Sequence, residues 1–187
     1  MRRIELGLIM LIPLWLGATD GGIQVSDNPP SGRAQLFPQV VKSSNGCIVA
    51  WEDNREIGTS SRFEIRAQRL NSQGQRQWND GDKLISAGFD DGHRMSLSMC
   101  EDDSGGAYIA FVNKQKTTNG KLAGVYIQHV DATGATWTNP ISVYTPGDWV
   151  WQFKDLPGRI TSICYDNNGG CWVAFVYAKL LLIPPVV

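Results

Sequence analysis

Cys47-Ile48-Val49-Ala50-Trp51 is the stretch that decides the fold, because it returns as Ala107-Tyr108-Ile109-Ala110-Phe111 and as Cys171-Trp172-Val173-Ala174-Phe175. The spacings are 60 residues (111 − 51) and 64 residues (175 − 111). A second stretch, residues 65–71, returns 60 residues later as 125–131, and a Gly and then a Trp follow both. Because these segments recur in the same order, they indicate an internal repeat of about sixty residues, in two full copies and one broken copy.

The repeated segments have the composition of short antiparallel strands. Residues 37–41 and 47–51 are β-rich runs on either side of a tight polar turn, which predicts a hairpin. Residues 63–70 alternate apolar and polar side chains, as a half-buried strand does, and short strands are predicted at 84–86 and 141–144. No later segment has a sustained helical period. The sequence therefore predicts an all-β fold of antiparallel four-stranded blades, an incomplete β-propeller of about two and a half repeats.

The N-terminus predicts export. A basic start, Met1-Arg2-Arg3, precedes an apolar run from Leu6 to Leu16, and Ala18 supplies a small residue at the expected cleavage point. This is the architecture of a signal peptide, and it is too short for a comfortable membrane span. We expect a secreted protein, extracellular or periplasmic, whose mature chain has no membrane span; the alternative is a buried N-terminal helix.

The repeat divides the remaining chain. Residues 20–26 resemble residues 80–86, so the mature chain is expected to begin with a lone outer strand. In a closed propeller such a strand completes the last blade and removes an exposed edge. The alternative is a short open β-array or an assembly of several chains. The predicted segments are the signal peptide (1–18), the repeats (19–178) with the lone strand (19–28), blade one (33–86), blade two (94–145) and a partial blade three (159–178), and an aberrant apolar tail (179–187).

A family resemblance rests on the first copy. It reads Trp51-Glu52-Asp53-Asn54-Arg55, then residues 65–74, then Trp78. This resembles the sialidase-like β-propeller repeats of large secreted bacterial proteins, of the type Trp-x-Asp-x-Arg followed by Ile-Tyr-Ala-Gln-Arg, over about residues 20–178. Most members have no assigned activity. The second copy departs from the type, with His129 where the first has Arg69. Residues 131–137 also echo the Asp-box of sialidases, a turn motif that implies a fold rather than an activity.

Three arginines are candidate ligands for a carboxylate. Arg33, Arg94 and Arg159 each lie shortly before the first strand of their copy, and arginine binds carboxylates in bidentate fashion. The resemblance to sialidases, which draw an arginine triad from different blades, favours convergence. Their unequal distances from that strand favour three separate loop positions instead, because side-chain direction alternates along a strand.

Three aromatic residues form a candidate binding platform. Trp149, Trp151 and Phe153 alternate in an insertion between the second and third copies, so an extended segment would place the three rings on one side. Such a surface can stack on sugar rings or on an apolar peptide. The alternative is that the rings pack against the neighbouring blade.

Two cysteines are candidates for a hairpin disulfide. If the turn between them has two central residues, Cys164 and Cys171 lie directly opposite each other at a separation that permits a disulfide. Otherwise the cysteines act as small buried hydrophobic residues.

No catalytic or metal constellation is present in the sequence. The two histidines, His93 and His129, occupy unrelated repeat positions, and the Asp-rich segments 90–92 and 102–105 have the spacing of turns rather than of calcium loops. We therefore predict no cofactor and no metal. The net charge of −1, from 17 basic and 18 acidic residues, disfavours a nucleic-acid partner.

The most favoured function is non-enzymatic: an extracellular scaffold or recognition module, with a glycan or protein ligand at the loops of the blade ends. The alternative is a fragment of a sialidase-like glycoside hydrolase, although no Tyr can be assigned as its nucleophile.

Overall fold

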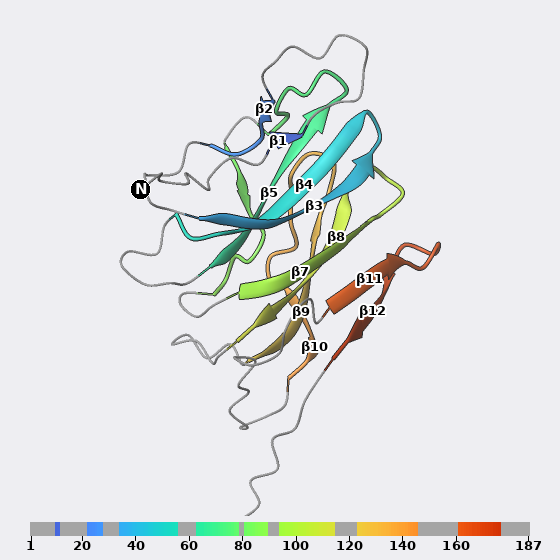
Figure 1. The fold of residues 1–187 in the computed structure, drawn as a ribbon. Helices are drawn as coiled ribbons and strands as arrows, with labels where there is room; N and C mark the ends of the chain where they lie inside the picture. Colours follow the sequence, from blue (N-terminus) through green and yellow to red (C-terminus); the bar gives the residue numbers. More distant parts are fainter. Residues whose placement is uncertain are drawn as a thin grey trace, which may run out of the picture.

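The computed structural model describes residues 10–11, 22–27, 34–55, 63–78, 81–89, 94–114, 123–145 and 161–176. Strands are the regular elements of these residues, which contain no helix, and every strand pair is antiparallel (Figure 1). The prediction of an all-β fold is confirmed. In the part of the chain that the structure describes, no helix is long and apolar enough to span a bilayer.

The first sheet has four strands in the order β3-β4-β5-β6. Its strands are β3 (Gln35–Ser43), β4 (Gly46–Asp53), β5 (Glu64–Asn71) and β6 (Lys83–Leu84). The hairpin from β3 to β4 turns at residues 44–45, and Gly46 has a positive φ of 139° that suits the absence of a side chain. The strands predicted at 37–41, 47–51 and 63–70 are found here, with changes at their ends. The strand predicted at 84–86 is shorter and begins earlier, at Lys83–Leu84, and residues 85–86 form a turn.

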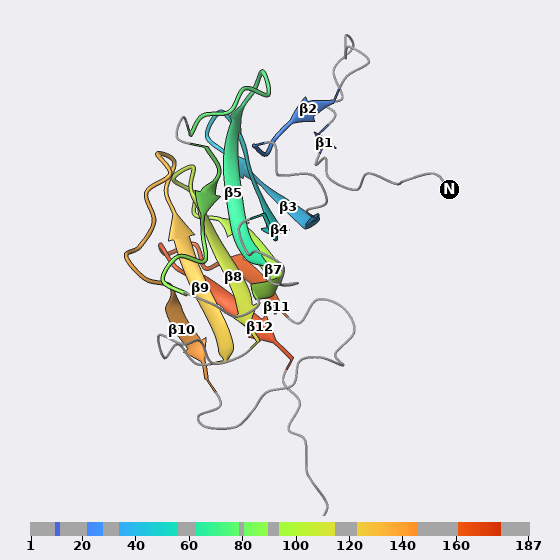
Figure 2. The same ribbon diagram turned by 90° about the vertical axis from the view of Figure 1, so that its left-hand side faces the viewer.

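The second sheet has the same sequential order of strands, β7-β8-β9-β10 (Figure 2). Its strands are β7 (Arg94–Glu101), β8 (Ala107–Asn113), β9 (Gly124–Val130) and β10 (Ile141–Tyr144). The first strand of each sheet contains an irregularity at the same place. The register shifts between Leu36 and Gln39 in β3 and between Met95 and Ser98 in β7. Each bulge holds one residue with a left-handed backbone, Phe37 or Ser96.

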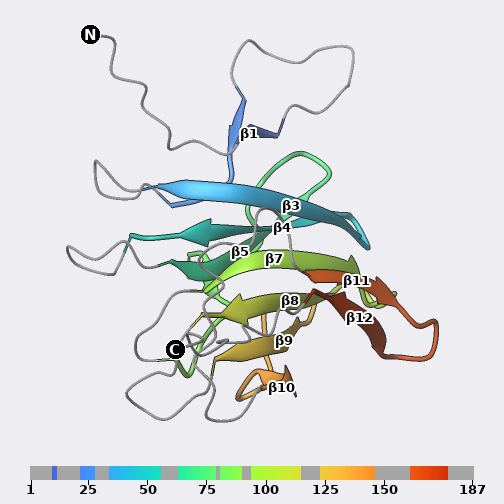
Figure 3. The ribbon, with the colours of Figure 1, turned by 60° about the horizontal axis from the view of Figure 1, so that its bottom comes forward.

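The third sheet contains two strands, β11 (Thr161–Tyr165) and β12 (Cys171–Phe175). A fourth small sheet pairs β1 (Met10–Leu11) with β2 (Ile23–Gln24). Figure 3 places β1 beyond β3, at the end of the stack away from β7. Strand β1 belongs to the predicted signal peptide, and β2 belongs to the predicted lone strand, which here pairs with β1.

The sheets stack face to face, with the second sheet in the middle. The larger apolar cluster lies between the first and second sheets, and the smaller one lies between the second and third. A further cluster, which includes Val25, Val49 and Trp51, lies on the outer face of the first sheet. The larger cluster includes Ile48, Ala50, Ile65, Leu97, Ile109 and Phe111. The smaller includes Val112, Val125, Val173 and Phe175. Burial of alternate side chains on both faces of the middle sheet explains why β8 is buried along its whole length.

Candidate functional site

Strands β4, β8 and β12 correspond to one another in the repeat. In each of them, the side chain at the same repeat position points in the direction that leads from the first sheet of the stack toward the third. In β4, Ile48 belongs to the cluster between sheets one and two. In β8, Ile109 and Phe111 face the first sheet, so alternation turns Tyr108 toward the third. The hydroxyl of Tyr108 donates to the carbonyl of Gly169 in the third sheet at 2.6 Å. Trp172 is the corresponding residue of β12.

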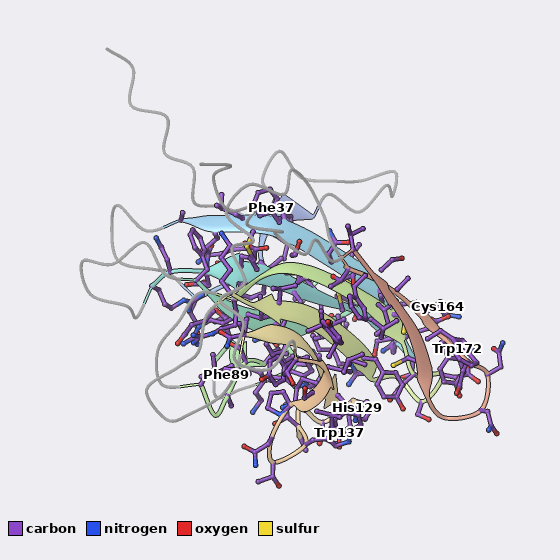
Figure 4. All side chains as sticks on the ribbon, turned by 90° about the horizontal axis from the view of Figure 1, so that it is seen from below. Phe37, Phe89, His129, Trp137, Cys164 and Trp172 are labelled. Atoms are coloured by element: carbon purple, nitrogen blue, oxygen red, sulfur yellow. The ribbon has the colours of Figure 1, made fainter. Side chains whose placement is uncertain are left out.

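Trp172 is exposed although its counterparts are buried. The exposed fraction is 0% for Ile48, 8% for Tyr108 and 71% for Trp172. Along the third sheet the exposed side chains alternate with partly buried ones. We call the exposed set Ser162, Cys164, Trp172, Ala174 and Val176 the open face. Figure 4 shows Trp172 and Cys164 on β11–β12 at one end of the stack.

Strand β12 also has an open edge. In the first two sheets the corresponding strands, β4 and β8, pair on that side with β5 and β9. Among the described residues, β12 pairs with β11 alone. In a sheet, the outer backbone groups of an edge strand are those that can pair with another strand. Within the described ranges, the third sheet thus has a face and an edge that correspond to those the other two sheets use for packing and pairing.

The motif Trp51-x-Asp53-x-Arg55 forms a buried ion network at the outer side of the first sheet. The indole of Trp51 donates to the Asp53 carboxylate at 2.8 Å, and the Arg55 guanidinium contacts the same carboxylate at 2.7 Å. Arg55 also contacts Asp82 at 2.6 Å, and Gln35 donates to Asp53 at 2.9 Å. Arg55 joins β4 to the turn before β6, and Gln35 joins β3 to the same Asp53 carboxylate.

The two carboxylates that hold Arg55 titrate differently. Burial acts to raise the pKa of Asp53, but hydrogen bonds from Arg55, Gln35 and Trp51 hold that pKa below its ordinary value. Burial raises the pKa of Asp82, and the opposing backbone hydrogen bond from Asp27 and the charge of Arg55 do not cancel the effect. The one guanidinium of Arg55 is held between the two carboxylates, so the geometry of this network is that of a structural clasp.

Arg94 lies inside the protein. It is 1% exposed, its guanidinium lies 5.6 Å from the centre of the Phe89 ring, and its Nη2 lies 3.9 Å from a carboxylate oxygen of Glu64. The carboxylate of Glu64 and the ring of Phe89 therefore lie beside Arg94, which was a candidate to bind a carboxylate ligand. Arg33 and Arg159 lie outside the described residues, so convergence of the three arginines stays a prediction.

The aromatic platform of Trp149, Trp151 and Phe153 also lies outside the described residues. The cysteine pairing, in contrast, can be compared with the structure. Cys164 lies opposite Trp172 and Cys171 lies opposite Tyr165, so the two cysteines are on opposite faces of the sheet. Both are free thiols, and the predicted hairpin disulfide is wrong.

The cause is the turn, which is longer than the two central residues that the pairing requires. Residues 166–170 connect the strands, and Asn167 and Gly169 adopt left-handed conformations. The Asp166 carboxylate accepts the backbone N–H groups of Asn168 and Gly170 at 2.7 and 2.8 Å. The extra length moves Cys171 one register position away from Cys164.

Asp102 shapes the corresponding turn of the second sheet. Its Oδ1 accepts the backbone N–H groups of Ser104 and Gly106 at 2.8 and 2.7 Å, and its Oδ2 lies 2.8 Å from Nε2 of His129. The reading of residues 102–105 as a turn is confirmed. Within the described ranges, no group of three acidic, His or Cys side chains is arranged to hold a metal ion.

The residues that echo the Asp-box also form a turn. The Asp131 carboxylate accepts the backbone N–H groups of Thr133 and Ala135 at 2.8 and 3.0 Å, and Gly134 has a φ of 89°. Trp137 then packs at 5.5 Å from the ring of His129. The interpretation of this segment as a folding motif is confirmed.

Replacing Asp131 with alanine is expected to lower the free energy of unfolding by about 1 kcal/mol, since three hydrogen bonds to a partly exposed carboxylate are lost. Chemical denaturation measures the change. Asp131→Asn keeps an acceptor oxygen in the same place and is expected to lose less than half as much. Equal losses for the two variants would show that the turn does not depend on this acceptor.

No protein-family model, curated protein or solved structure matches this chain. The class of the protein is therefore defined by its fold: an all-β protein built from stacked antiparallel sheets.

Sequence reasoning missed two features of the candidate site. The spacing of Trp51 and Asp53 places both side chains on one face of a strand, which was a signal for their contact, but Asp82 is remote in sequence. The alignment of Trp172 with Ile48 and Tyr108 was a signal for a residue that faces a next sheet.

Proposed function

We propose that this chain is a non-catalytic, exported β-scaffold that works by presenting the open face and the turns at the sheet ends to a protein or glycan ligand. The observation that carries the proposal is Trp172, which is exposed at a repeat position that is buried in the other two sheets. Trp172 shares its face of the third sheet with the exposed Ala174 and Val176, and an exposed group of apolar side chains supports a role in interaction.

The chemistry of the described polar groups supports the same proposal. The buried Asp53 and Asp82 hold Arg55, and Asp102 holds a turn and His129. These groups serve packing and turn geometry rather than a cleft for a substrate. We also propose that the stacked sheets are blades of an incomplete β-propeller. The sequential strand order and the contacts of β3 with β7 and of β7 with β11 are what support it.

Turnover assays and binding assays test the proposed function. We expect no hydrolysis of a fluorogenic sialoside by the purified chain, assayed beside a sialidase as a positive control. Hydrolysis that co-purifies with the chain would contradict the proposal and favour the glycoside-hydrolase alternative. On a glycan array, any bound glycan should be lost in Trp149→Ala or Trp151→Ala if the aromatic platform binds it.

The proposed export has its own test. When the chain is expressed with a secretion system, mass spectrometry of the exported protein is expected to show that residues 1–18 have been removed. Removal would also take away β1, and the edge of β2 that pairs with it would become available. An exported protein that retains Met1 would contradict the signal-peptide assignment.

A further inference from the structure

We infer that the open face binds a second copy of this chain, head to tail, so that β3 of one copy packs on β11–β12 of the other. This inference rests on the proposed function, because it names the partner of the same surface.

The stack already shows how one sheet packs on the next. Strand β3 contacts β7, and β7 contacts β11, so the first strands of successive sheets lie against one another. The side chains that point in the direction from the first sheet toward the third are Ile48 in the first sheet, Tyr108 in the second and Trp172 in the third. A sheet that places a first strand against β11 would bury Trp172 as its counterparts are buried.

The first sheet of a second copy offers such a strand. Val41 packs against the cluster that faces the second sheet, so alternation turns Val40 to the opposite side of β3. Val40 lies opposite Val49, which faces away from the second sheet, and Val40 is 54% exposed. Its counterpart in the second sheet, Met99, is packed against the larger cluster. We call the exposed side of β3 around Val40 the leading face.

The distribution of exposed apolar side chains agrees with this pairing. Six large hydrophobic side chains are exposed among the described residues, and four of them lie at the two ends of the stack. Phe37 and Val40 lie on β3, and Trp172 and Val176 lie on or directly after β12. Figure 4 shows Phe37 on β3 at the opposite side of the stack from Trp172.

Head-to-tail contact has a simple geometric consequence. A heterologous interface closes into a ring or continues as a filament. The three stacked sheets of the described residues, without the small β1–β2 sheet, give six in two copies (2 × 3), which is within the range of about four to eight blades that propellers use. We therefore expect a closed dimer, in which each copy uses both its leading face and its open face.

Sedimentation velocity of the full chain and its variants tests the inference. Wild type is expected to shift from monomer to dimer as its concentration rises, and longer species would also support head-to-tail contact. Trp172→Lys, which disables the open face, and Val40→Lys, which disables the leading face, should each remain monomeric. Ile141→Lys is the matched control, since Ile141 is also 54% exposed but lies on β10.

A mixture of the two monomeric variants distinguishes this contact from a symmetric one. Trp172→Lys keeps a leading face and Val40→Lys keeps an open face, so an equimolar mixture should form one dimer and nothing larger. Dimerisation of Val40→Lys alone would overturn the inference in favour of open-face to open-face pairing. Circular dichroism of each variant establishes that it is folded.

Failure of the inference and failure of the proposed function give different results. Wild type that stays monomeric at every concentration overturns the second copy as partner, while the absence of sialoside hydrolysis leaves the scaffold proposal standing. Hydrolysis of the sialoside overturns the scaffold proposal whatever the oligomeric state is.

Discussion

Asp53→Ala is expected to lower the free energy of unfolding by about 3 to 5 kcal/mol, the usual cost of removing one partner from a buried ion pair. Asp53 is fully buried, and its carboxylate accepts hydrogen bonds from Trp51, Gln35 and Arg55. Without it the Arg55 guanidinium keeps only Asp82 among the partners described above, and the Trp51 indole N–H loses its acceptor. Urea denaturation followed by far-UV circular dichroism measures the change.

Arg76→Ala is the matched control for this prediction. Arg76 pairs with Asp27 on the same outer side of the first sheet, but both side chains are more than a third exposed. An exposed ion pair contributes at most about 1 kcal/mol. Equal losses for Asp53→Ala and Arg76→Ala would contradict the account of the network as a buried clasp.

Glu52→Gln is expected to stabilise the protein above pH 7 and to remove much of the pH dependence of its stability. Burial raises the pKa of Glu52 from 4.5 to about 7, although the backbone N–H of Ser96 donates to its carboxylate at 2.7 Å and Lys114 lies nearby. A pKa above that of the unfolded chain means that the folded state holds the proton more tightly. The stability from this group is therefore complete below pH 4.5 and is lost as the pH rises through 7.

The size of the effect follows from the shift. The difference between 4.5 and about 7 corresponds to about 3 kcal/mol of stability lost between those pH values. Gln keeps an oxygen that can accept the Ser96 N–H and carries no charge. Thermal melts from pH 5 to pH 8 measure the dependence, with Glu101→Gln, an exposed change at the end of β7, as the control. A Glu52→Gln profile parallel to that of wild type would contradict the prediction.

The strands could be predicted from sequence because their pattern is local. Residues 63–70 alternate apolar and polar side chains, and β5 covers Glu64–Asn71. The pairing of Cys164 with Cys171 could not be read correctly, because it depends on the length of a turn that Asp166 lengthens by accepting two backbone hydrogen bonds. The same Asp-x-x-Gly-Gly spacing at Asp102 was a usable signal for the longer turn.

The candidate site was less accessible to sequence reasoning than the strands. Ile48, Tyr108 and Trp172 can be aligned by the repeat, but whether such a residue is buried depends on the sheet that lies next to it. Arg94 shows the converse. The sequence predicts it in a loop before a strand, as a candidate ligand, whereas it is the first residue of β7 and is buried beside Phe89 and Glu64. The exposure of Trp172 and the burial of Arg94 both depend on contacts between segments that are remote in sequence.

The fluorescence of Trp172 tests the central claim, that the third sheet presents an open face, most directly. The emission of Trp172→Phe subtracted from that of wild type isolates this residue among seven tryptophans. In dilute solution the account predicts that the isolated emission is that of a solvated indole and is quenched efficiently by acrylamide. A Trp172 emission that is typical of a buried indole and resists acrylamide at the same dilution would contradict it.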